Sequence, residues 1–133
     1  MTDSLREERR PPPCTDAQID SADRAFTKQL GHPLPEAYKR VLYCANGLKH
    51  NGLIVWPIRP YFVFQQTIFE ANEDLRDSLS DQFLYYGQWD EELYVFDLDR
   101  KRYCAIEFVG KQAWMEFEDD TQMFEFMMHR AWD

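Results

Sequence analysis

Carboxylates gather at one predicted turn of this chain, in the run Trp89-Asp90-Glu91-Glu92, and two more follow at Asp97 and Asp99. Two carboxylates held close together can perform general acid–base chemistry, as in glycosidases, or can bind a divalent metal ion. The spacing matches no EF-hand loop, however, and aspartates in turns usually accept hydrogen bonds from backbone amides of solvated loops. The pattern therefore favours neither catalysis nor a metal site.

The same acidic run has a second interpretation, as part of a protein-binding surface. Three aromatic residues lie beside it in the sequence and can supply apolar anchors. In protein interfaces, buried aromatic side chains carry much of the affinity, whereas charges at the rim guide the approach of the partner. We therefore expect a candidate surface for a basic partner, made of Tyr85, Tyr86, Trp89, Asp90, Glu91, Glu92, Asp97 and Asp99.

The other residue types that commonly do chemistry have no catalytic spacing. The three histidines lie on different predicted elements without an HExxH pattern, and none of the five glycines has the spacing of a phosphate-binding loop. The cysteines are odd in number and lack CxxC spacing, which predicts neither a disulfide framework nor a zinc site and fits a reducing cytoplasm. These residues are His32, His50, His129, Cys14, Cys44 and Cys104. The sequence predicts no enzyme, no metal and no cofactor.

Composition and charge narrow the class of partner. The chain has 133 residues, of which 44% are hydrophobic, enough for a single core. It carries 24 acidic and 15 basic side chains, a formal net charge of −9, which repels phosphate backbones and anionic membranes. No run approaches the roughly 20 apolar residues of a membrane span. We expect no nucleic-acid or membrane partner; the acidity either attracts a basic protein or only maintains solubility.

Two helices are predicted after a polar N-terminal segment. Residues 1–14 include Pro11-Pro12-Pro13 and predict a flexible tail that is not a secretory signal, followed by one domain over 15–133. Thr15 and Gln18 form a capping-box pattern before a helix over about 16–30. Pro35 then suits the first turn of a second helix, and Asn46-Gly47 supplies its exit.

The remaining pattern predicts a sheet and two more helices. Asn51-Gly52 predicts a turn before a strand at 53–56, segment 61–64 fits either a strand or a packed loop, and Thr67 with Glu70 opens a helix over 68–79. Strand periodicity follows at 83–86, 92–97, 102–108 and 113–117, and Asp119 or Asp120 caps a last helix. The chain therefore reads as α+β, with N-terminal, middle and C-terminal helices packed on a mainly antiparallel sheet of about four to six strands.

One segment carries a family resemblance, from Leu34 to Ile58, where a proline-started helix precedes two Asn-Gly pairs and a buried strand. Further motifs follow in the same order, namely 68–76, Tyr85-Tyr86-Gly87, 92–97 and a Phe-rich terminal helix. This order resembles the SUKH superfamily of Smi/Knr-like domains, and within it most closely the YrhA-like branch, over roughly residues 16–132. The motifs are hydrophobic patterns without a chemical signature, so they bear on fold more than on function.

The resemblance implies an immunity protein that binds and neutralises a cognate bacterial toxin, such as a polymorphic, contact-dependent or secretion-system effector, by occlusion. Toxin-binding surfaces vary within the family, so no contact residue is transferred. One alternative is a regulatory or scaffolding module that binds an endogenous partner. Another is an acid-pair hydrolase, which requires the carboxylates between Asp90 and Asp99 to converge in one pocket. The pattern leaves open whether the chain is a monomer or a homodimer.

Overall fold

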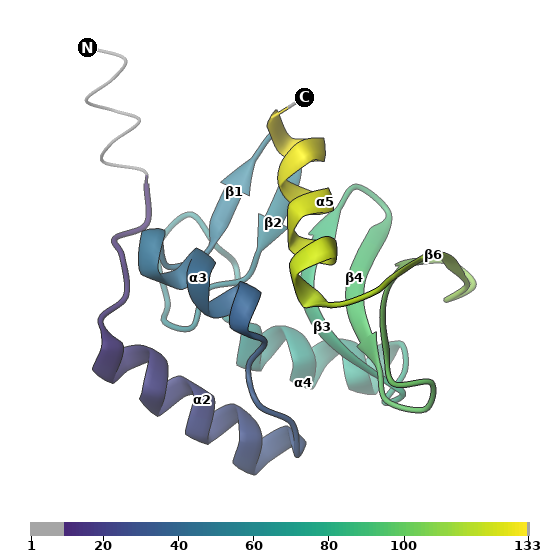
Figure 1. Ribbon diagram of the computed structural model, residues 1–133, viewed down its shortest axis with the longest axis horizontal. Coiled ribbons are helices and arrows are strands. Elements are labelled where there is room, and N and C mark those ends of the chain that lie inside the picture. The colour runs from purple at the N-terminus through teal and green to yellow at the C-terminus, as the bar shows by residue number, and fades with distance from the viewer. Residues whose placement is uncertain (1–9, 133) are drawn as a thin grey trace.

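The computed structural model describes residues 10–132, which form four helices and six strands. The strands make one antiparallel sheet in chain order. Figure 1 shows α3 and α5 side by side in front of the sheet, with α2 below α3 and α4 at the lower end of β3. This arrangement confirms the predicted α+β fold. The elements are α2 (Asp16–Leu30), α3 (Glu36–Cys44), β1 (Leu48–His50), β2 (Leu53–Val55), α4 (Ile68–Ser78), β3 (Phe83–Trp89), β4 (Glu92–Asp97), β5 (Arg102–Glu107), β6 (Ala113–Phe117) and α5 (Asp120–Trp132).

Two helices begin where their capping boxes predict. The hydroxyl of Thr15 accepts a hydrogen bond from the N–H of Gln18 at 3.2 Å, and the Gln18 side chain accepts from the N–H of Thr15 at 2.9 Å. Thr67 and Glu70 make the same reciprocal pair at the start of α4. Each pair satisfies two backbone donors that a helix start leaves open, using residues three positions apart. These helix starts therefore depend on local sequence.

The start of α3 is capped from a distant part of the chain. Pro35 precedes the helix and offers no capping side chain, but the carboxylate of Asp120 accepts a hydrogen bond from the N–H of Ala37 at 2.9 Å. Asp119 caps the start of α5 locally, because its carboxylate accepts a hydrogen bond from the N–H of Gln122 at 2.8 Å. The two adjacent aspartates thus hold the starts of two different helices together.

The structure describes only the last five residues of the predicted tail, because residues 1–9 lie outside the described part of the chain. Within this segment Pro11 and Cys14 are buried. The carbonyl of Pro12 accepts from the N–H of Asn46 at 2.9 Å, and the N–H of Cys14 donates to the carbonyl of Leu42 at 2.8 Å. An extended Pro-rich segment makes no internal hydrogen bonds, so its backbone groups are available for such pairing. The packed region therefore begins before residue 15.

The first hairpin contains a strand that the sequence pattern did not predict. Asn51 and Gly52 both have positive φ, 47° and 86°, and form a two-residue turn that pairs β1 with β2. Segment 61–64, predicted as a strand or a packed loop, is a loop.

The Asn46 side chain holds the backbone that follows β2. It accepts a hydrogen bond from the N–H of Ile58 and donates one to the carbonyl of Arg59, both at 2.9 Å. Polar side chains therefore organise this end of the sheet.

Strand β3 is longer than predicted because a glycine lets its neighbour approach. The predicted strand ends at Tyr86, whereas β3 continues to Trp89 and pairs with β2 through Gly87. A Cβ atom at Gly87 would lie only 2.8 Å from the carbonyl oxygen of Ile54, so any larger residue there would force the backbones apart. A register shift next to Gly87 also marks an irregularity in the pairing of β3 with β4.

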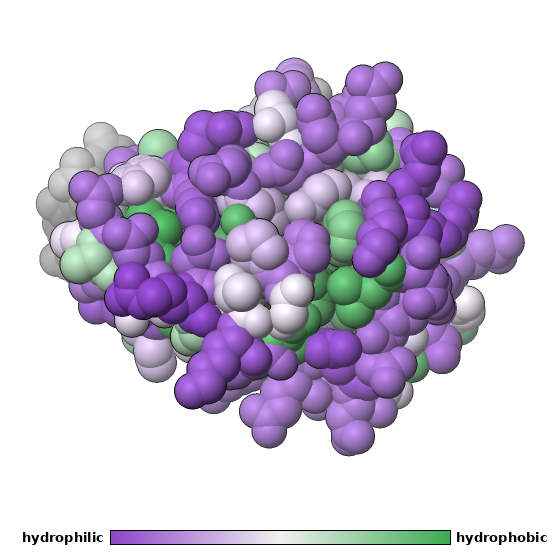
Figure 2. Space-filling view, turned by 60° about the horizontal axis from the view of Figure 1, so that its bottom comes forward, coloured by the Kyte–Doolittle hydropathy of each residue, from purple (hydrophilic) through white to green (hydrophobic). Residues whose placement is uncertain are grey.

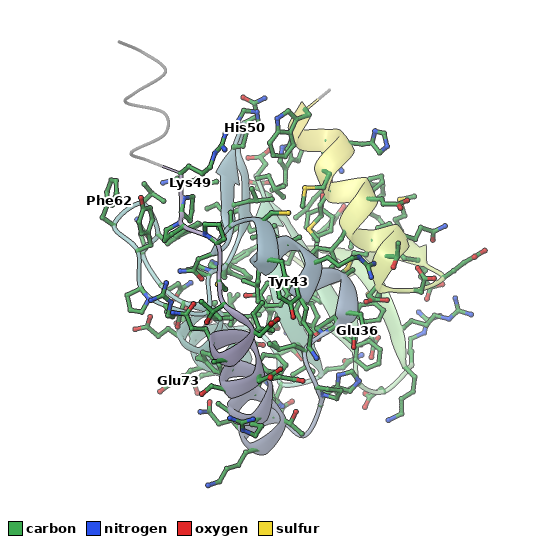
Figure 3. All side chains as sticks on the ribbon, turned by 60° about the vertical axis from the view of Figure 1, so that its left-hand side comes forward. Glu36, Tyr43, Lys49, His50, Phe62 and Glu73 are labelled. Carbon is green, nitrogen blue, oxygen red and sulfur yellow. The ribbon has the colours of Figure 1, made fainter. Side chains whose placement is uncertain are left out.

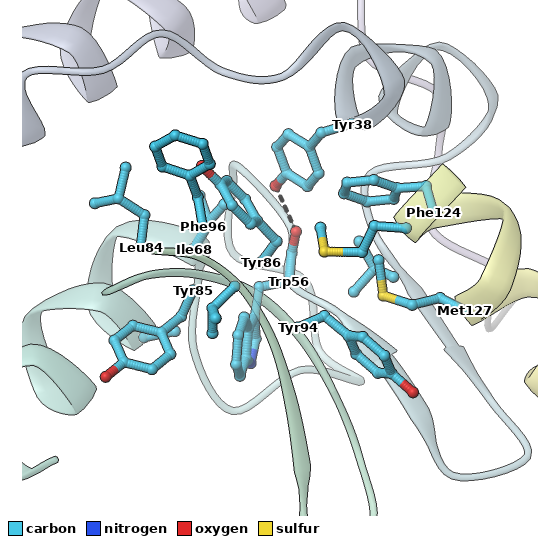
Figure 4. Close-up of a cluster of buried hydrophobic side chains, with 14 of the residues drawn as sticks. Tyr38, Trp56, Ile68, Leu84, Tyr85, Tyr86, Tyr94, Phe96, Phe124 and Met127 are labelled. Carbon is cyan, nitrogen blue, oxygen red and sulfur yellow. Dashed lines mark hydrogen bonds between the residues drawn. The ribbon is translucent and has the colours of Figure 1, made fainter. Parts of the chain in front are cut away.

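The two central strands are covered on both faces, which corrects the role predicted for Tyr85 and Tyr86. Side chains alternate between faces along a strand, yet Leu84, Tyr85 and Tyr86 are all fully buried. Figure 4 shows this aromatic cluster, in which Tyr38 donates its hydroxyl hydrogen bond to the carbonyl of Trp56. Burial raises the pKa of Tyr85 to about 12. Both tyrosines belong to the core and cannot serve as surface anchors, because neither side chain is exposed.

Helix α5 completes this core with Met123, Phe124 and Met127, which are buried as the apolar spacing of the helix predicts. Phe124 lies 6.0 Å from Tyr38 and 6.4 Å from Tyr86 between ring centroids. Because these side chains anchor α5 in the core, they also fix the positions of the other side chains of the helix. No helix between residues 10 and 132 is long and apolar enough to cross a membrane.

Candidate protein-binding surface

The structure divides the predicted acidic cluster into two groups. Trp89 to Glu92 form the turn between β3 and β4, whereas Asp97 and Asp99 lie at the turn between β4 and β5. These turns are at the upper and lower ends of β4 in Figure 1. Asp97 is five residue steps along the extended strand from Glu92, a length of about 17 Å. The acid pair that the hydrolase hypothesis requires is therefore not formed between the two turns.

Asp97 has a structural role, which corrects its prediction as a rim residue. Its side chain is buried, and one carboxylate oxygen accepts hydrogen bonds from the N–H groups of Asp99 and Arg100 at 3.0 and 3.1 Å. Gln82 donates to both oxygens of the carboxylate, at 3.1 and 3.2 Å. Aspartate often stabilises a turn in this way, because its short side chain reaches the backbone two residues ahead. Asp99 itself is exposed.

The other turn places three functional side chains in one row. Trp89 is paired with Glu92 in the sheet register, and Glu92 is paired with Glu107 of β5. Directly paired residues of neighbouring strands point to the same face. The sheet therefore presents a tryptophan and two glutamates side by side at the end of three strands, on the face that α5 covers. Asp90 and Glu91 form the tip of the turn, where Asp90 has a φ of 54°.

Arg130 of α5 lies over this row. Its guanidinium carbon is 4.1 Å from the centroid of the Trp89 ring, and its Nη1 is 2.7 Å from Oε2 of Glu92. The Tyr94 hydroxyl donates to the same carboxylate oxygen at 3.1 Å. Burial, followed by the charge of Glu92, keeps the pKa of Tyr94 far above its usual value, so this hydroxyl stays a donor. Arg130 thus neutralises Glu92 and fastens the last turns of α5 to the sheet.

Trp114 comes from β6 and closes the far side of the row. Its ring centroid lies 6.0 Å from that of Phe126 and 5.6 Å from the guanidinium carbon of Arg130. The pairing of β5 with β6 shifts register at this position, so Trp114 has no direct partner on β5. Neither Trp114 nor Arg130 was predicted as a site residue. Only the tertiary structure brings them beside Trp89, and no spacing in the sequence indicates this.

These residues line one open cavity, which we call the turn surface. Its volume is about 620 Å³, and its lining consists of Trp89, Asp90, Glu91, Glu92, Glu107, Val109, Trp114 and Arg130. The side chains of Asp90, Glu91 and Glu107 are exposed and form no ion pair with any residue of the described chain. Trp114 is 45% exposed and Val109 76%. Exposed apolar groups beside unpaired carboxylates suit a basic protein partner.

The described residues contain no group of three or more His, Cys, Asp or Glu side chains arranged to hold a metal ion. The turn surface has four carboxylates, but Glu92 is engaged with Arg130 and the other three lie on separate parts of the hairpin tips. What the arrangement can do chemically is attract and hold cationic side chains.

Two other cavities lie on the opposite side of α5 and share Leu48 and Trp132. One, of about 720 Å³, runs between α3 and α5 and is lined mainly by apolar side chains, Val41, Phe124 and Met128 among them. The second, of about 790 Å³, lies near the exposed Phe62 and beside Lys49 and His50, which Figure 3 shows on one side of the molecule. Trp132 stacks on His50 with centroids 4.3 Å apart. Among the described residues, neither cavity has a group of carboxylates like that of the turn surface, and the second is lined instead by the cationic side chains of Arg10 and Lys49.

Comparison with known proteins identifies the family. The model of the SMI1 / KNR4 family (SUKH-1) matches residues 13–127. The chain is also similar to the crystal structure of a protein from Pseudomonas syringae pv. tomato, with a TM-score of 0.60 and 15% sequence identity over 92% of each chain, a likeness that concerns fold alone. The comparison with curated proteins gives no match. The narrower resemblance to the YrhA-like branch stays a prediction. The chain belongs to the SMI1 / KNR4 family, SUKH-1.

Proposed function

We propose that this protein is an immunity protein that neutralises a cognate bacterial toxin by binding it. Family membership supports an immunity-like role, since SUKH domains are generally non-catalytic immunity modules. The observation that carries the proposal is the turn surface, where exposed Trp114 and Val109 stand beside three carboxylates that form no ion pair with any of residues 10–132. Such a surface has the chemistry to bind a basic protein domain. We place the encounter in the cytoplasm, which the sequence predicts.

The proposed interface retains half of the residues predicted from sequence. Trp89, Asp90, Glu91 and Glu92 stay within it and are joined by Glu107, Val109, Trp114 and Arg130. Tyr85, Tyr86 and Asp97 are withdrawn because they are buried, and Asp99 because it lies at the other end of β4. The proposed interface therefore extends from the β3–β4 turn to the adjoining ends of β5 and β6 and to α5.

Inhibition by occlusion follows from the charges and the apolar centre of this surface. The net charge of −9 attracts a basic toxin domain over distances of about a Debye length, which accelerates association at low salt. Desolvation of Trp114 and Val109 then supplies affinity. A stable interface buries about 1,600 Å² in total, so the turn surface forms its centre and neighbouring residues complete it.

The test is calorimetric titration of the purified protein with the toxin domain encoded beside its gene, at low and at physiological salt. A triple variant, Asp90→Asn/Glu91→Gln/Glu107→Gln, removes three exposed charges and keeps side-chain size, and asparagine tolerates the positive φ at position 90. We expect tight one-to-one binding that salt weakens, and a loss of about tenfold or more in the variant.

A matched control separates the site from general electrostatics. Glu73→Gln/Asp74→Asn/Asp77→Asn changes the net charge by the same amount on the exposed side of α4. This control should bind the toxin nearly as well as the wild type. Equal losses in both triple variants would mean that only net charge matters. Absence of binding by the wild type would make the regulatory or scaffolding module the leading account.

A further inference from the structure

We infer that Trp114 and Glu107 form a receptor for an arginine side chain of the partner. The inference rests on the proposed function for the identity of that partner, but the receptor itself is argued from side chains of this protein. Its basis is a repetition of residue types: Trp89 and Glu92 hold Arg130 on one side of the turn surface, and Trp114 and Glu107 repeat the two types on the other side. Arg130 is farther from the Trp114 ring, at 5.6 Å, and Glu107 forms no ion pair within residues 10–132.

The occupied pair demonstrates how this surface holds a guanidinium group. Arg130 stacks over Trp89 at 4.1 Å and forms a 2.7 Å ion pair with Glu92. The side chains of Arg130 and Glu92 are only 25% and 20% exposed, so the contact is partly shielded from water. A cation over an aromatic face and beside a carboxylate gains both cation–π and hydrogen-bond energy. The pair Trp89 and Glu92 is therefore already an arginine site, filled from within the chain.

The second pair, Trp114 and Glu107, which we call the vacant pair, lines the same cavity. Glu107 is the direct cross-strand partner of Glu92, so two carboxylates stand on neighbouring strands and only one of them faces a cation. Like charges directly opposite each other in a sheet are destabilising. A second cation beside Glu107 would relieve this repulsion. The site therefore has an electrostatic reason to accept one.

A register shift in the pairing of β5 with β6 takes Trp114 out of the regular strand pairing. Residues 105 and 106 pair with Met115 and Ala113, so Trp114 between them has no partner on β5 and bulges from the strand. Bulges re-aim side chains in this way. The ring contacts Phe126 and lies 5.6 Å from Arg130, yet 45% of the residue stays exposed. An incoming planar group can therefore stack on it.

The described chain offers no cation of its own for this position. Lys111, which follows in the β5–β6 turn, donates to the carbonyl of Leu79 at 3.0 Å. Arg130 forms its ion pair with Glu92 and stacks on Trp89 at 4.1 Å, whereas its guanidinium carbon is 5.6 Å from the Trp114 ring. Arginine fits the vacancy better than lysine, because its flat guanidinium stacks on an indole ring while presenting a fork of N–H donors to the carboxylate.

The test uses short peptides and ¹⁵N–¹H NMR spectra of the whole protein. The probe is Ac-Gly-Arg-Gly-Arg-Gly-NH₂, compared with peptides that carry lysine or neutral citrulline in place of arginine. We expect the arginine peptide to shift the indole signal of Trp114 and the amide of Glu107. The lysine peptide should bind about two- to fivefold more weakly, and the citrulline peptide should cause no shift.

Two variants and a control locate the site. Glu107→Gln should weaken the arginine peptide about two- to fivefold, and Trp114→Leu, which keeps an apolar side chain, should abolish the preference for arginine over lysine. Glu73→Gln, the same change on α4, should leave affinity unchanged; Figure 3 shows Glu73 at the surface. The spectra themselves report whether each variant is folded.

The outcomes separate this inference from the proposed function. Shifts spread over all acidic residues, or equal binding of arginine and lysine peptides, would overturn the arginine receptor even if the toxin binds the wild type tightly. Arginine-selective shifts at Trp114 without toxin binding would support the receptor while the immunity function fails. If both hold, Glu107→Gln should also weaken toxin binding.

Discussion

Glu92 and Asp97 begin and end the same strand, yet their carboxylates have opposite roles. Asp97 is buried and accepts hydrogen bonds from two backbone N–H groups of its own turn and from Gln82. Glu92 reaches across to Arg130 of another helix, beside three carboxylates that have no cation within the described chain. The difference teaches that side-chain length and the direction of the strand decide whether an acid in a hairpin supports the turn or faces a partner.

The surroundings of the two ends differ as well. The turn after Asp97 contains Arg100 and Lys101, Arg102 begins β5, and Arg100 pairs with Glu116 at 3.0 Å. The lower end of the molecule, brought forward in Figure 2, is mainly hydrophilic with small hydrophobic areas. The Glu92 end instead combines two tryptophans with acids. A basic partner is therefore attracted to the Glu92 end and repelled by the cations of the other.

The largest expected effect is on the stability of the core, at the buried residue Tyr85. Tyr85→Ala should lower the free energy of unfolding by about 3–5 kcal/mol, since it empties a fully buried aromatic site. Tyr85→Phe, which loses only the hydrogen bond to the carbonyl of Ser80, should cost about 1 kcal/mol. Urea unfolding measures both. A cost below 1 kcal/mol for the alanine variant would return Tyr85 to the list of candidate anchors.

The same burial predicts a pH dependence. The pKa of Tyr85 is about 12 in the folded protein, mainly through desolvation, against about 10 in an unfolded chain. The unfolded state therefore releases its proton first, and the stabilising contribution, complete below pH 10, is lost as pH rises toward 12. Stability should fall less over this range in Tyr85→Phe than in the wild type. Identical curves would contradict the assignment.

Asp97→Ala should produce the next largest effect and sharpen the contrast between the two ends. The variant leaves two backbone N–H groups and the Gln82 amide without their acceptor, so we expect a loss of about 2–3 kcal/mol in unfolding free energy. Asp99→Ala, at an exposed position of the same turn, should change stability by about 0.5 kcal/mol or less. Weaker toxin binding by folded Asp97→Ala protein would break the proposed division of roles.

Arg130→Met should lower stability less than Asp97→Ala does, by about 1–2 kcal/mol, because the methionine keeps an apolar stem over Trp89. The loss should be greatest at low salt, since the two neighbouring carboxylates of Glu92 and Glu107 then repel each other with least screening. A double-mutant cycle with Glu92→Gln measures the coupling, expected near 1 kcal/mol. A coupling of zero would mean that Arg130 does not organise the turn surface.

Local patterns predicted the helices well because their signals are local. The capping boxes at Thr15 and Thr67 give the correct starts of α2 and α4, and Gly31, with a φ of 74°, ends α2 at the predicted residue. Strands β4 and β6 also match their predicted bounds. Strand β1 was missed because three residues of mixed polarity show no periodicity; only their pairing with β2 defines them.

The candidate site was half predictable for a related reason. Trp89 to Glu92 are neighbours in the sequence and remain neighbours in space, since a tight turn joins them. Tyr85 and Tyr86 are also close to Trp89 along the chain, but their side chains are fully buried in the core. Burial on both faces is a property of the assembled layers, which a run of aromatic residues does not reveal.

The sequence by itself determined the family, the α+β class, the helix starts and the acidic character of the chain, because each depends on residue types or on spacings of a few positions. The tertiary structure alone decided that Asp120 caps α3, that Glu107 stands beside Glu92, and that Arg130 lies between two tryptophans. Residues separated by 15 to 83 positions meet in these contacts only after the strands take their register and α5 packs on the sheet, and many-body packing of this kind leaves no local pattern.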